Sequence, residues 1–213
     1  MHIIKATYYI EDDVRGDDII RRIARAARTC YKSDMDTAPV NSDHTLVANL
    51  INRGHEAMLE HASFSVRFIV DRGVSHELVR HRIASFAQES TRYCNYSKDR
   101  FGGEITVIEP CFLQIGTLAY EDWRRSCETA EEAYFSMLGW GCTPQEARAV
   151  LPMSLKSELV MTANIREWRH FLKLRAADAT GAAHPQMKEV AVPLLNELKS
   201  LIPVVFDDIG GAK

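Results

Sequence analysis

The amino-acid sequence predicts an α+β fold, and two kinds of apolar spacing support this prediction. Residues 2–10 and 63–70 alternate side chains at the two-residue period of a β-strand. Longer segments repeat apolar residues every three or four positions, which is the period of an amphipathic helix. The strands and helices do not alternate as strict βαβ units, which favours α+β over a doubly wound parallel sheet. The 213 residues contain no internal repeat, low-complexity tract or evident linker, so a single domain over residues 1–213 is expected.

The first half of the chain is expected to form a strand, two helices, a second strand and a short helix. Asp17 and Asp18 suit a helix N-terminus, and the helix they open carries an apolar stripe of Ile20, Ile23, Ala27 and Tyr31. A second helix is predicted over residues 43–52, ending near Gly54. The strand at residues 63–70 is followed by a short helix predicted over residues 74–82.

The second half is predicted to be mainly helical. A long helix ends near Gly139, because one face carries Trp123, Cys127, Ala130, Tyr134 and Met137. Thr143-Pro144-Gln145-Glu146 has the pattern of a capping box with proline at the first helical position. Another helix is predicted to begin at Asn164. The apolar stripe of the final helix comprises Met187, Val190, Ala191, Leu194, Leu195, Leu198 and Leu201.

Composition argues against several classes of protein. Charged residues make up 26% of the chain and the net charge is -3, which disfavours a surface wholly devoted to nucleic acid but allows a local basic patch. No apolar run approaches the roughly 20 residues of a membrane helix, and the first residues lack a signal-peptide pattern. The five cysteines are scattered without a CxxC pair, so neither a zinc knuckle nor a disulfide framework is predicted. We therefore expect a cytoplasmic protein with reduced, buried thiols.

The densest cluster of polar side chains lies at residues 80–93. It holds three arginines and no lysine, and arginine favours bidentate recognition of phosphate or carboxylate. If the short helix includes Arg80 and Arg82, their side chains point in separate directions, and one can serve a nucleotide while the other serves a cofactor. If the chain is extended after Ala87, alternate side chains share one face, namely Gln88, Ser90 and Arg92. The alternative is a solvated basic turn.

Residues 55–61 contain two histidines and two glutamates, a composition that suggests a metal site. His55 and His61 are six residues apart, however, and the helical HExxH spacing is absent. No metal site is therefore predicted, and Glu60 or His61 is expected to form hydrogen bonds next to the following strand.

Arg175 falls on the apolar stripe of the helix that begins at Asn164, together with Trp168, Phe171 and Leu172. Burying an unpaired charge is costly, so this arginine needs a partner, either an internal carboxylate or an anionic ligand. Arg166 and His170 share a neighbouring face of the same helix. A pocket suited to a nucleotide monophosphate, and to a base that becomes anionic, would combine Arg80, Arg92, Arg148 and Arg175.

The order Arg80-His81-Arg82, seven residues, then Ser90 and Thr91-Arg92-Tyr93 resembles the signature of flavin-dependent thymidylate synthases. The resemblance runs over most of the chain, since it also covers residues 54–61, 148–152, 164–166 and 172–175. It implies an antiparallel sheet flanked by helices, in a homotetramer of α/β subunits that share their active sites.

This resemblance also implies the reaction and its small-molecule partners. The family methylates dUMP to dTMP, with FAD as the cofactor and methylenetetrahydrofolate as the carbon donor. NADPH reduces the flavin, which passes on the hydride. Neither nucleic acid nor a membrane is an expected partner.

The resemblance places two sets of residues around the ligands. The set near FAD comprises His55, Ala57, Glu60, Arg80, His81, Arg82, Gln88, Asn164, Ile165, Arg166 and His170. The set around dUMP comprises Glu77, Leu78, Val79, Arg80, Gln88, Glu89, Ser90, Thr91, Arg92, Arg148 and Arg175. Arg175 is the expected catalytic residue, because it matches the arginine thought to favour ionisation of uracil N3 and so to activate C5.

Two features depart from the family pattern. Ala57 stands where the family often carries a hydroxyl residue near FAD, so one hydrogen bond to the flavin is expected to be missing. Residues 178–184 align only loosely with a histidine-containing stretch of the family, and His184 is given no role.

Other interpretations of the same residues compete. Pro110-Cys111 is followed by Phe112 and Leu113, unlike the Pro-Cys-Gln-Arg motif of the cysteine-dependent thymidylate synthases, so Cys111 is expected to be a buried thiol. Ser90 has no evident base and is expected to contact dUMP rather than act as a nucleophile.

Two functional alternatives follow from the arginine cluster. A non-enzymatic phosphate or nucleic-acid binder would show steeply salt-dependent binding and no flavin, and the acidic balance argues against it. A flavoenzyme of the same family that hydroxymethylates its base, or accepts dCMP, stays open, because base selection can depend on one or two hydrogen-bonding groups.

Overall fold

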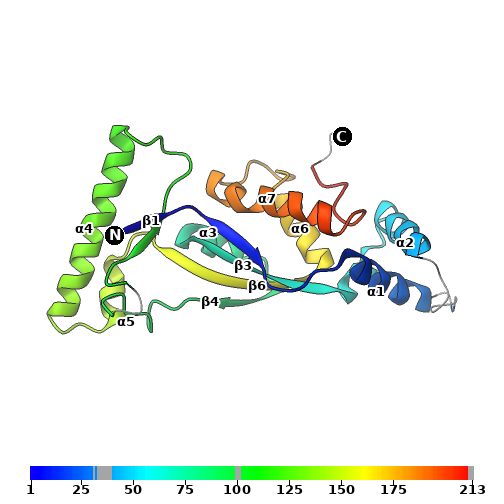
Figure 1. The fold of residues 1–213 in the computed structure, drawn as a ribbon, viewed down its shortest axis with the longest axis horizontal. Coiled ribbons are helices and arrows are strands. Elements are labelled where there is room, and N and C mark those ends of the chain that lie inside the picture. Colours follow the sequence, from blue (N-terminus) through cyan, green and yellow to red (C-terminus); the bar gives the residue numbers. More distant parts are fainter. Residues whose placement is uncertain (31, 33–39, 99–101, 211–213) are drawn as a thin grey trace. The chain divides into compact units, whose positions relative to one another are not determined.

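The computed structural model describes residues 1–30, 32, 40–98 and 102–210, and it has the expected α+β architecture with an antiparallel sheet. Figure 1 labels the elements along the chain. The larger sheet has four strands in the order β2 (Thr7–Ile10), β3 (Ser63–Asp71), β6 (Lys156–Asn164) and β4 (Ala84–Gln88). A second, parallel pair consists of β1 (His2–Ile4) and β5 (Thr106–Ile108), in which Ile3 lies opposite Val107.

Helices account for most of the remaining elements. In chain order they are α1 (Gly16–Thr29), α2 (Val40–Asn52), α3 (Arg72–Leu78), α4 (Leu118–Gly139), α5 (Pro144–Ala147), α6 (Ile165–Arg175) and α7 (Pro185–Leu201). In the part of the chain that the structure describes, the 3-10 helices η1 (Glu56–His61) and η3 (Arg148–Val150) precede β3 and β6. Among the described residues, no helix is both long and apolar enough to cross a membrane. Tyr31, predicted on the stripe of α1, lies outside the described residues.

The chain divides into two compact units that alternate along the sequence. The first unit comprises Met1–Thr7, Phe68–Arg80 and Phe86–Val160, and the second comprises Tyr8–Arg67, His81–Ser85 and Met161–Lys213. The single domain expected from the sequence stays a prediction.

The core of the first unit forms around α4. Its predicted apolar face places Cys127 and Tyr134 in a buried cluster with Tyr96, Ile105 and Val107. Burial of such large side chains contributes about 1.5–3 kcal/mol each. The helix begins at a proper cap, because the backbone N–H of Tyr120 donates to the Thr117 hydroxyl at 3.3 Å.

The core of the second unit includes side chains of β3, α1, α6 and α7. Trp168 of α6 stacks on Phe64 of β3 with ring centroids 5.0 Å apart, and α7 buries the stripe predicted for it. Gly16 begins α1 at a point of close approach, since a Cβ atom there would lie 2.1 Å from the carbonyl oxygen of Leu201. Only glycine fits this contact, and it sets how closely the start of α1 meets the end of α7.

Residues 2–10 form two strands rather than the single predicted strand. Lys5 and Ala6 interrupt the run, so β1 pairs with β5 while β2 joins the larger sheet. Side-chain alternation continues across the break and therefore cannot show that the strand changes partners.

The short helix also differs from its predicted range of residues 74–82. It begins at Arg72, because the Asp71 carboxylate accepts the backbone N–H of Val74 at 2.6 Å, and it ends at Leu78. The arginine motif at residues 80–82 therefore lies outside the helix, and the prediction that helical geometry separates Arg80 from Arg82 was wrong.

The chain is not extended beyond Gln88, where β4 ends. Ser90 accepts the backbone N–H of Tyr93 at 3.0 Å, which closes a turn at residues 91–93. Gln88, Ser90 and Arg92 therefore do not share one strand face. The polar Ser-Thr-Arg sequence supports a turn as readily as a strand, and the local hydrogen bond decides between them.

Candidate functional site

His81 is the buried member of the arginine motif. It is 6% exposed, whereas Arg80 and Arg82 on either side of it are exposed. The chain bends between the end of α3 and the start of β4, and this turns the histidine inward. A motif that looks like a basic surface in sequence therefore buries its central residue.

His81 connects two side chains of α6. Its Nδ1 lies 3.3 Å from Oε1 of Glu167, and Nε of Arg175 donates to its Nε2 at 3.2 Å. Phe171 packs edge-on against the imidazole with centroids 5.0 Å apart, and the ring of His170 lies 5.9 Å away. Glu167, Phe171 and Arg175 follow one another at intervals of four residues, so α6 presents all three on one face.

The imidazole of His81 is neutral at physiological pH. Burial is the main cause, and with the charge of Arg175 and the electrostatic effect of nearby His170 it lowers the pKa of His81 to about 4. Burial also raises the pKa of Glu167 above its usual value. The site thus combines a fixed guanidinium with a neutral ring that accepts its N–H.

His81, Glu167 and His170 also meet the spacing of a metal site among the described residues, since their candidate ligand atoms lie within 4.8 Å of one another. A metal on Nδ1 of His81 would require the lone pair there and would leave the proton on Nε2. That proton would face the Nε–H of Arg175, which already donates to the same nitrogen. The hydrogen bonds therefore favour a polar chain over a metal centre.

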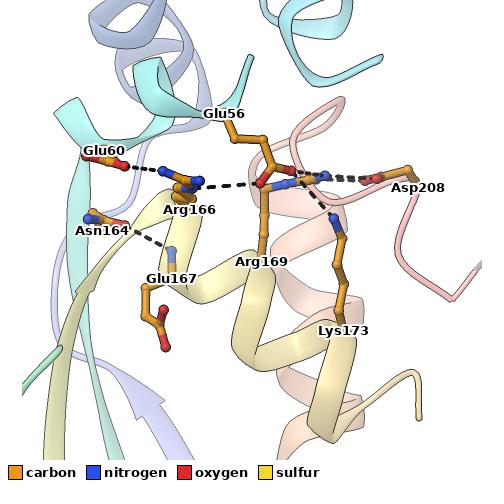
Figure 2. A network of polar contacts seen from close by, with 8 residues as sticks. All are labelled: Glu56, Glu60, Asn164, Arg166, Glu167, Arg169, Lys173 and Asp208. Carbon is orange, nitrogen blue, oxygen red and sulfur yellow. Dashed lines mark hydrogen bonds and ion pairs between the residues drawn. The ribbon is translucent and has the colours of Figure 1, made fainter. Parts of the chain in front are cut away.

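Figure 2 shows a polar network that joins η1, α6 and the C-terminal segment. Arg166 forms an ion pair with Glu60 at 2.5 Å, and Asn164 caps α6 by accepting the backbone N–H of Glu167 at 2.9 Å. Ile165 is fully buried. The three residues 164–166, all predicted to lie near FAD, thus lie together at the start of α6. Of these three, only Arg166 is exposed.

Arg169 carries the most deeply buried charge of that network. It is 1% exposed, and its guanidinium binds both carboxylate oxygens of Asp208, at 2.7 and 2.8 Å, and Glu56 at 3.3 Å. It also donates to the carbonyl of Val205. Burial is the largest influence on Asp208 and opposes its ionisation, but the hydrogen bond and charge of Arg169, together with the charge of Lys173, lower the pKa of Asp208 overall. This arginine is therefore neutralised internally.

An apolar pocket of about 350 Å³ brings two predicted FAD residues together in the second unit, and it is lined by Ala27, Cys30, Leu50, His55, Ala57 and Met58. Sequence reasoning missed the contribution of α1 and α2 to this pocket. Cys30 follows the last residue of α1, one helical turn beyond Ala27, and this spacing was the available signal.

A second pocket of about 290 Å³ lies within the first unit and is lined by Arg72, Thr91, Arg148, Ala149, Leu151, Pro152, Met153 and Leu155. Arg148 donates to the hydroxyl of buried Thr91 at 3.4 Å, so two residues of the predicted dUMP set meet here. Arg72 is an additional cation that the sequence analysis missed, because the helix was expected to begin two residues later.

The end of β4 is held by hydrogen bonds within the first unit. The Gln88 amide donates to Ser75 at 2.9 Å and to Ser157 at 3.0 Å, while Glu89 accepts from Tyr96 at 3.1 Å and from Lys156 at 2.9 Å. These contacts fix the segment that leads into the turn at residues 91–93.

The family model described as thymidylate synthase complementing protein matches residues 15–204. This chain belongs to that family. Among its relatives, the flavin-dependent thymidylate synthase of Geobacter sulfurreducens is 33% identical over 194 residues, which cover 88% of this chain and 81% of the relative. The flavin-dependent thymidylate synthase of Corynebacterium aurimucosum is 36% identical, covering 86% of this chain and 77% of the relative.

A solved structure resembles this member of the thymidylate synthase complementing protein family over almost its full length. The UMP/dUMP methylase PolB from Streptomyces cacaoi, bound with 5-Br dUMP, aligns with a TM-score of 0.78 and 27% identity. The alignment covers 97% of this chain and 96% of that chain. The same methylase bound with 5-Br UMP aligns with a TM-score of 0.75.

The other predicted site residues of this family member differ in exposure. Glu77 is half-buried, Leu78 is fully buried and Val79 is exposed. Arg92 lies over the ring of Tyr93 at 5.4 Å, and the hydroxyl of Ser90 accepts the backbone N–H of Arg92 at 3.3 Å. Their roles toward ligands stay predictions.

One expectation for this family member needs correction: Cys111 is exposed rather than buried, as is Cys30. Cys111 lies in a turn after β5, and Cys30 follows the last residue of α1. The hydrogen bond described above joins Arg175 to the ring of His81, and its pairing with a carboxylate or an anionic ligand stays a prediction. His184, which received no role, caps α7 by accepting the backbone N–H of Gln186 at 3.3 Å.

Proposed function

We propose that this protein is a flavin-dependent thymidylate synthase that methylates dUMP to dTMP. The proposal rests on the position of Arg175, whose guanidinium donates a hydrogen bond to the neutral ring of His81. His81 is the central residue of the arginine motif at residues 80–82. The bond to His81 orients the guanidinium without neutralising its charge. Membership of the family, and relatives named as flavin-dependent thymidylate synthases, support the assignment.

The second unit offers groups that fit FAD. The apolar pocket beside His55 and Ala57 suits part of a planar ring system, and the exposed guanidinium groups of Arg82 and Arg166 suit a pyrophosphate. When bound, the flavin would supply the hydride that reduces the transferred carbon to a methyl group. Methylenetetrahydrofolate and NADPH are the proposed carbon donor and reductant.

The first unit offers groups that fit the nucleotide. Arg72 and Arg148 line a pocket with Thr91 and would bind the phosphate of dUMP. Arg175 belongs to the second unit and is the group proposed to act on the base, because a positioned cation stabilises the negative charge that ionisation of N3 places on the uracil ring. The increased electron density at C5 would then favour its attack on the methylene carbon, with cleavage of the bond from that carbon to the folate nitrogen and loss of the proton from C5.

The reaction is tested by incubating the purified protein with FAD, NADPH, methylenetetrahydrofolate and dUMP, and identifying the product by mass. We expect dTMP that requires FAD, and a loss of product in Arg175→Ala. Arg124→Ala is the matched control, since this exposed arginine of α4 pairs only weakly with Glu121 and Glu128 at 3.4 and 3.7 Å. A hydroxymethylated product, turnover of dCMP alone, or no product and no bound flavin would each overturn the proposal.

A second candidate activity is methylation of UMP. The observation that favours it is the structural similarity to a methylase described for both UMP and dUMP and solved with an analogue of each. The same assay with UMP in place of dUMP decides the point, with the ratio of kcat/KM for the two nucleotides as the measured quantity.

We further propose a cytoplasmic homotetramer whose active sites are shared between subunits. Light scattering of the purified protein measures the mass. Sharing is tested by mixing Arg148→Ala with Arg175→Ala, each inactive alone. Mixed tetramers would regain part of the activity if the two arginines of one site come from different subunits, and would stay inactive if one subunit supplies both.

A further inference from the structure

We propose that Glu167 is a positioning residue, which fixes the tautomer of His81 and thereby aims Arg175. The catalytic consequence rests on the proposed function, whereas the tautomer itself follows from the contacts within the second unit. Nothing in the family resemblance assigned Glu167 a role, because it precedes the apolar stripe of α6 in sequence and looks like an ordinary first-turn acid.

The donor and acceptor roles follow from Arg175. A guanidinium nitrogen only donates, so the 3.2 Å contact from Nε of Arg175 requires a lone pair on Nε2 of His81. A neutral imidazole then carries its proton on Nδ1. Nδ1 lies 3.3 Å from Oε1 of Glu167, and this carboxylate oxygen accepts a hydrogen bond from the Nδ1–H group.

Because it is buried, the contact with Glu167 determines which ring nitrogen of His81 carries the proton. His81 is 6% exposed and Glu167 is 5% exposed, so water does not readily replace either partner. A buried N–H without an acceptor is destabilising, and the other tautomer would relieve that cost by moving the proton to Nε2. Arg175 would then face a donor and lose its contact. Glu167 therefore determines whether His81 can hold Arg175.

The backbone of Glu167 is itself fixed. Its N–H donates to the Asn164 cap at 2.9 Å, and Phe171 packs against the imidazole one helical turn later. The chain Glu167–His81–Arg175 thus connects the start of α6 to its last residue through one ring. The same proton on Nδ1 keeps a metal ion from the three-residue cluster described above.

The experiment compares Glu167→Leu, which removes the acceptor, with Glu167→Gln, whose amide oxygen can still accept. Glu197→Leu is the matched control, because it removes a carboxylate of the same unit. That carboxylate accepts a hydrogen bond from the hydroxyl of Tyr8 at 2.8 Å and has no proposed role toward His81. The ¹⁵N spectrum of histidine-labelled, FAD-loaded protein reports which ring nitrogen of His81 is protonated, and steady-state kinetics with dUMP report the rate.

We expect the Nδ1–H tautomer in the wild type, in Glu167→Gln and in Glu197→Leu, and its loss in Glu167→Leu. We also expect kcat to fall on the order of tenfold in Glu167→Leu, as commonly happens when the outer partner of a functional histidine is removed, with a smaller change in KM. Restoration of the rate in Glu167→Gln supports positioning over a merely structural role.

The proposal is overturned by an Nε2–H tautomer in the wild type, or by a Glu167→Leu variant with unchanged tautomer and rate. Failure of the wild type to form dTMP would instead sink the proposed function. The spectrum would still decide the tautomer in that case, so the two failures are distinguishable.

Discussion

Two arginines on α6, Arg169 and Arg175, show how the partner of a charge separates structure from function. Arg169 is almost fully buried and binds both oxygens of Asp208 together with Glu56, as Figure 2 shows. Arg175 is half-buried and donates to a neutral imidazole. The first guanidinium is neutralised by carboxylates, whereas the bond to His81 holds the second without adding a negative charge to it. Both lie on one helix, so the difference comes from their partners and not from local backbone structure.

Replacing Arg169 should give the largest effect, and on stability. Arg169→Ala leaves Asp208, which is 44% exposed, and Glu56, which is 25% exposed, without the buried cation that they share. Because water can partly solvate these carboxylates, the cost should lie at the lower end of the about 3–5 kcal/mol expected when one partner of a buried ion pair is removed. Urea denaturation measures the free energy of unfolding. Arg166→Ala is the matched control, since its exposed pair with Glu60 should contribute no more than about 1 kcal/mol. A loss below about 1 kcal/mol in Arg169→Ala would contradict the structural role.

Replacing Arg175 should affect the rate instead. Arg175→Ala should lower the single-turnover rate of dTMP formation about 100-fold or more, because it removes a preorganised cation from the developing anion. The free energy of unfolding should change by less than in Arg169→Ala, since the contact with a neutral ring is worth about 1.5–3 kcal/mol at most. Arg175→Lys keeps the charge but not the planar geometry, and it should recover only part of the rate. Equal losses of stability in Arg169→Ala and Arg175→Ala would break the comparison between these residues.

The two arginines also mark the limit of what the sequence could predict. Helical periodicity identified α4, α6 and α7 correctly, because these elements depend on local spacing. It also predicted that Arg175 lies among apolar residues and needs a partner. The identity of that partner could not be predicted, since His81 is 94 residues away in sequence and Glu167 is 86 residues from His81. Such pairs are created by the fold.

Arg169 was missed for a related reason. The apolar stripe was identified from Trp168, Phe171 and Leu172, and the sequence analysis made no prediction for Arg169, which follows Trp168. The burial of Arg169 depends on the C-terminal segment, in which Asp208, 39 residues later in sequence, accepts a hydrogen bond from its guanidinium. The break between β1 and β2 likewise depends on pairing with distant strands, and strand partners are not encoded in alternation.

The pH dependence of the free energy of unfolding should test the environment of Arg175, through the pKa of its partner His81. The folded pKa of His81, about 4, lies below the value of 6.5 for an unperturbed histidine. Between these values the unfolded state binds the extra proton, so stability should fall as the pH drops from about 6.5 to 4. The maximum contribution is about 3 kcal/mol, since one pKa unit corresponds to about 1.4 kcal/mol.

Measuring this effect requires a variant, because a nearby group acts in the opposite direction. The raised pKa of Glu167 adds stability at low pH that is lost as the pH rises. Urea denaturation of the wild type and of His81→Asn across this range gives the difference due to His81, with Arg175, His170 and Glu167 retained. A steeper decline on acidification in His81→Asn than in the wild type would contradict the assignment.

The smallest expected effect is at the exposed edge of the Arg169 network. Lys173 lies 3.5 Å from the same Oε1 of Glu56 that pairs with Arg169, but its side chain is 39% exposed. Solvent screens such a pair, so Lys173→Ala should lower the free energy of unfolding by about 0.2–1 kcal/mol, and less at high salt. In the Arg169→Ala background the same substitution should cost more, because Lys173 then supplies a larger share of the positive charge near Glu56 and Asp208, with Arg166 4.0 Å from Glu56 as a further cation, and contacting residues are not additive. If the two substitutions are simply additive, the carboxylates do not share their charge between the two cations, and Arg169 alone neutralises the network.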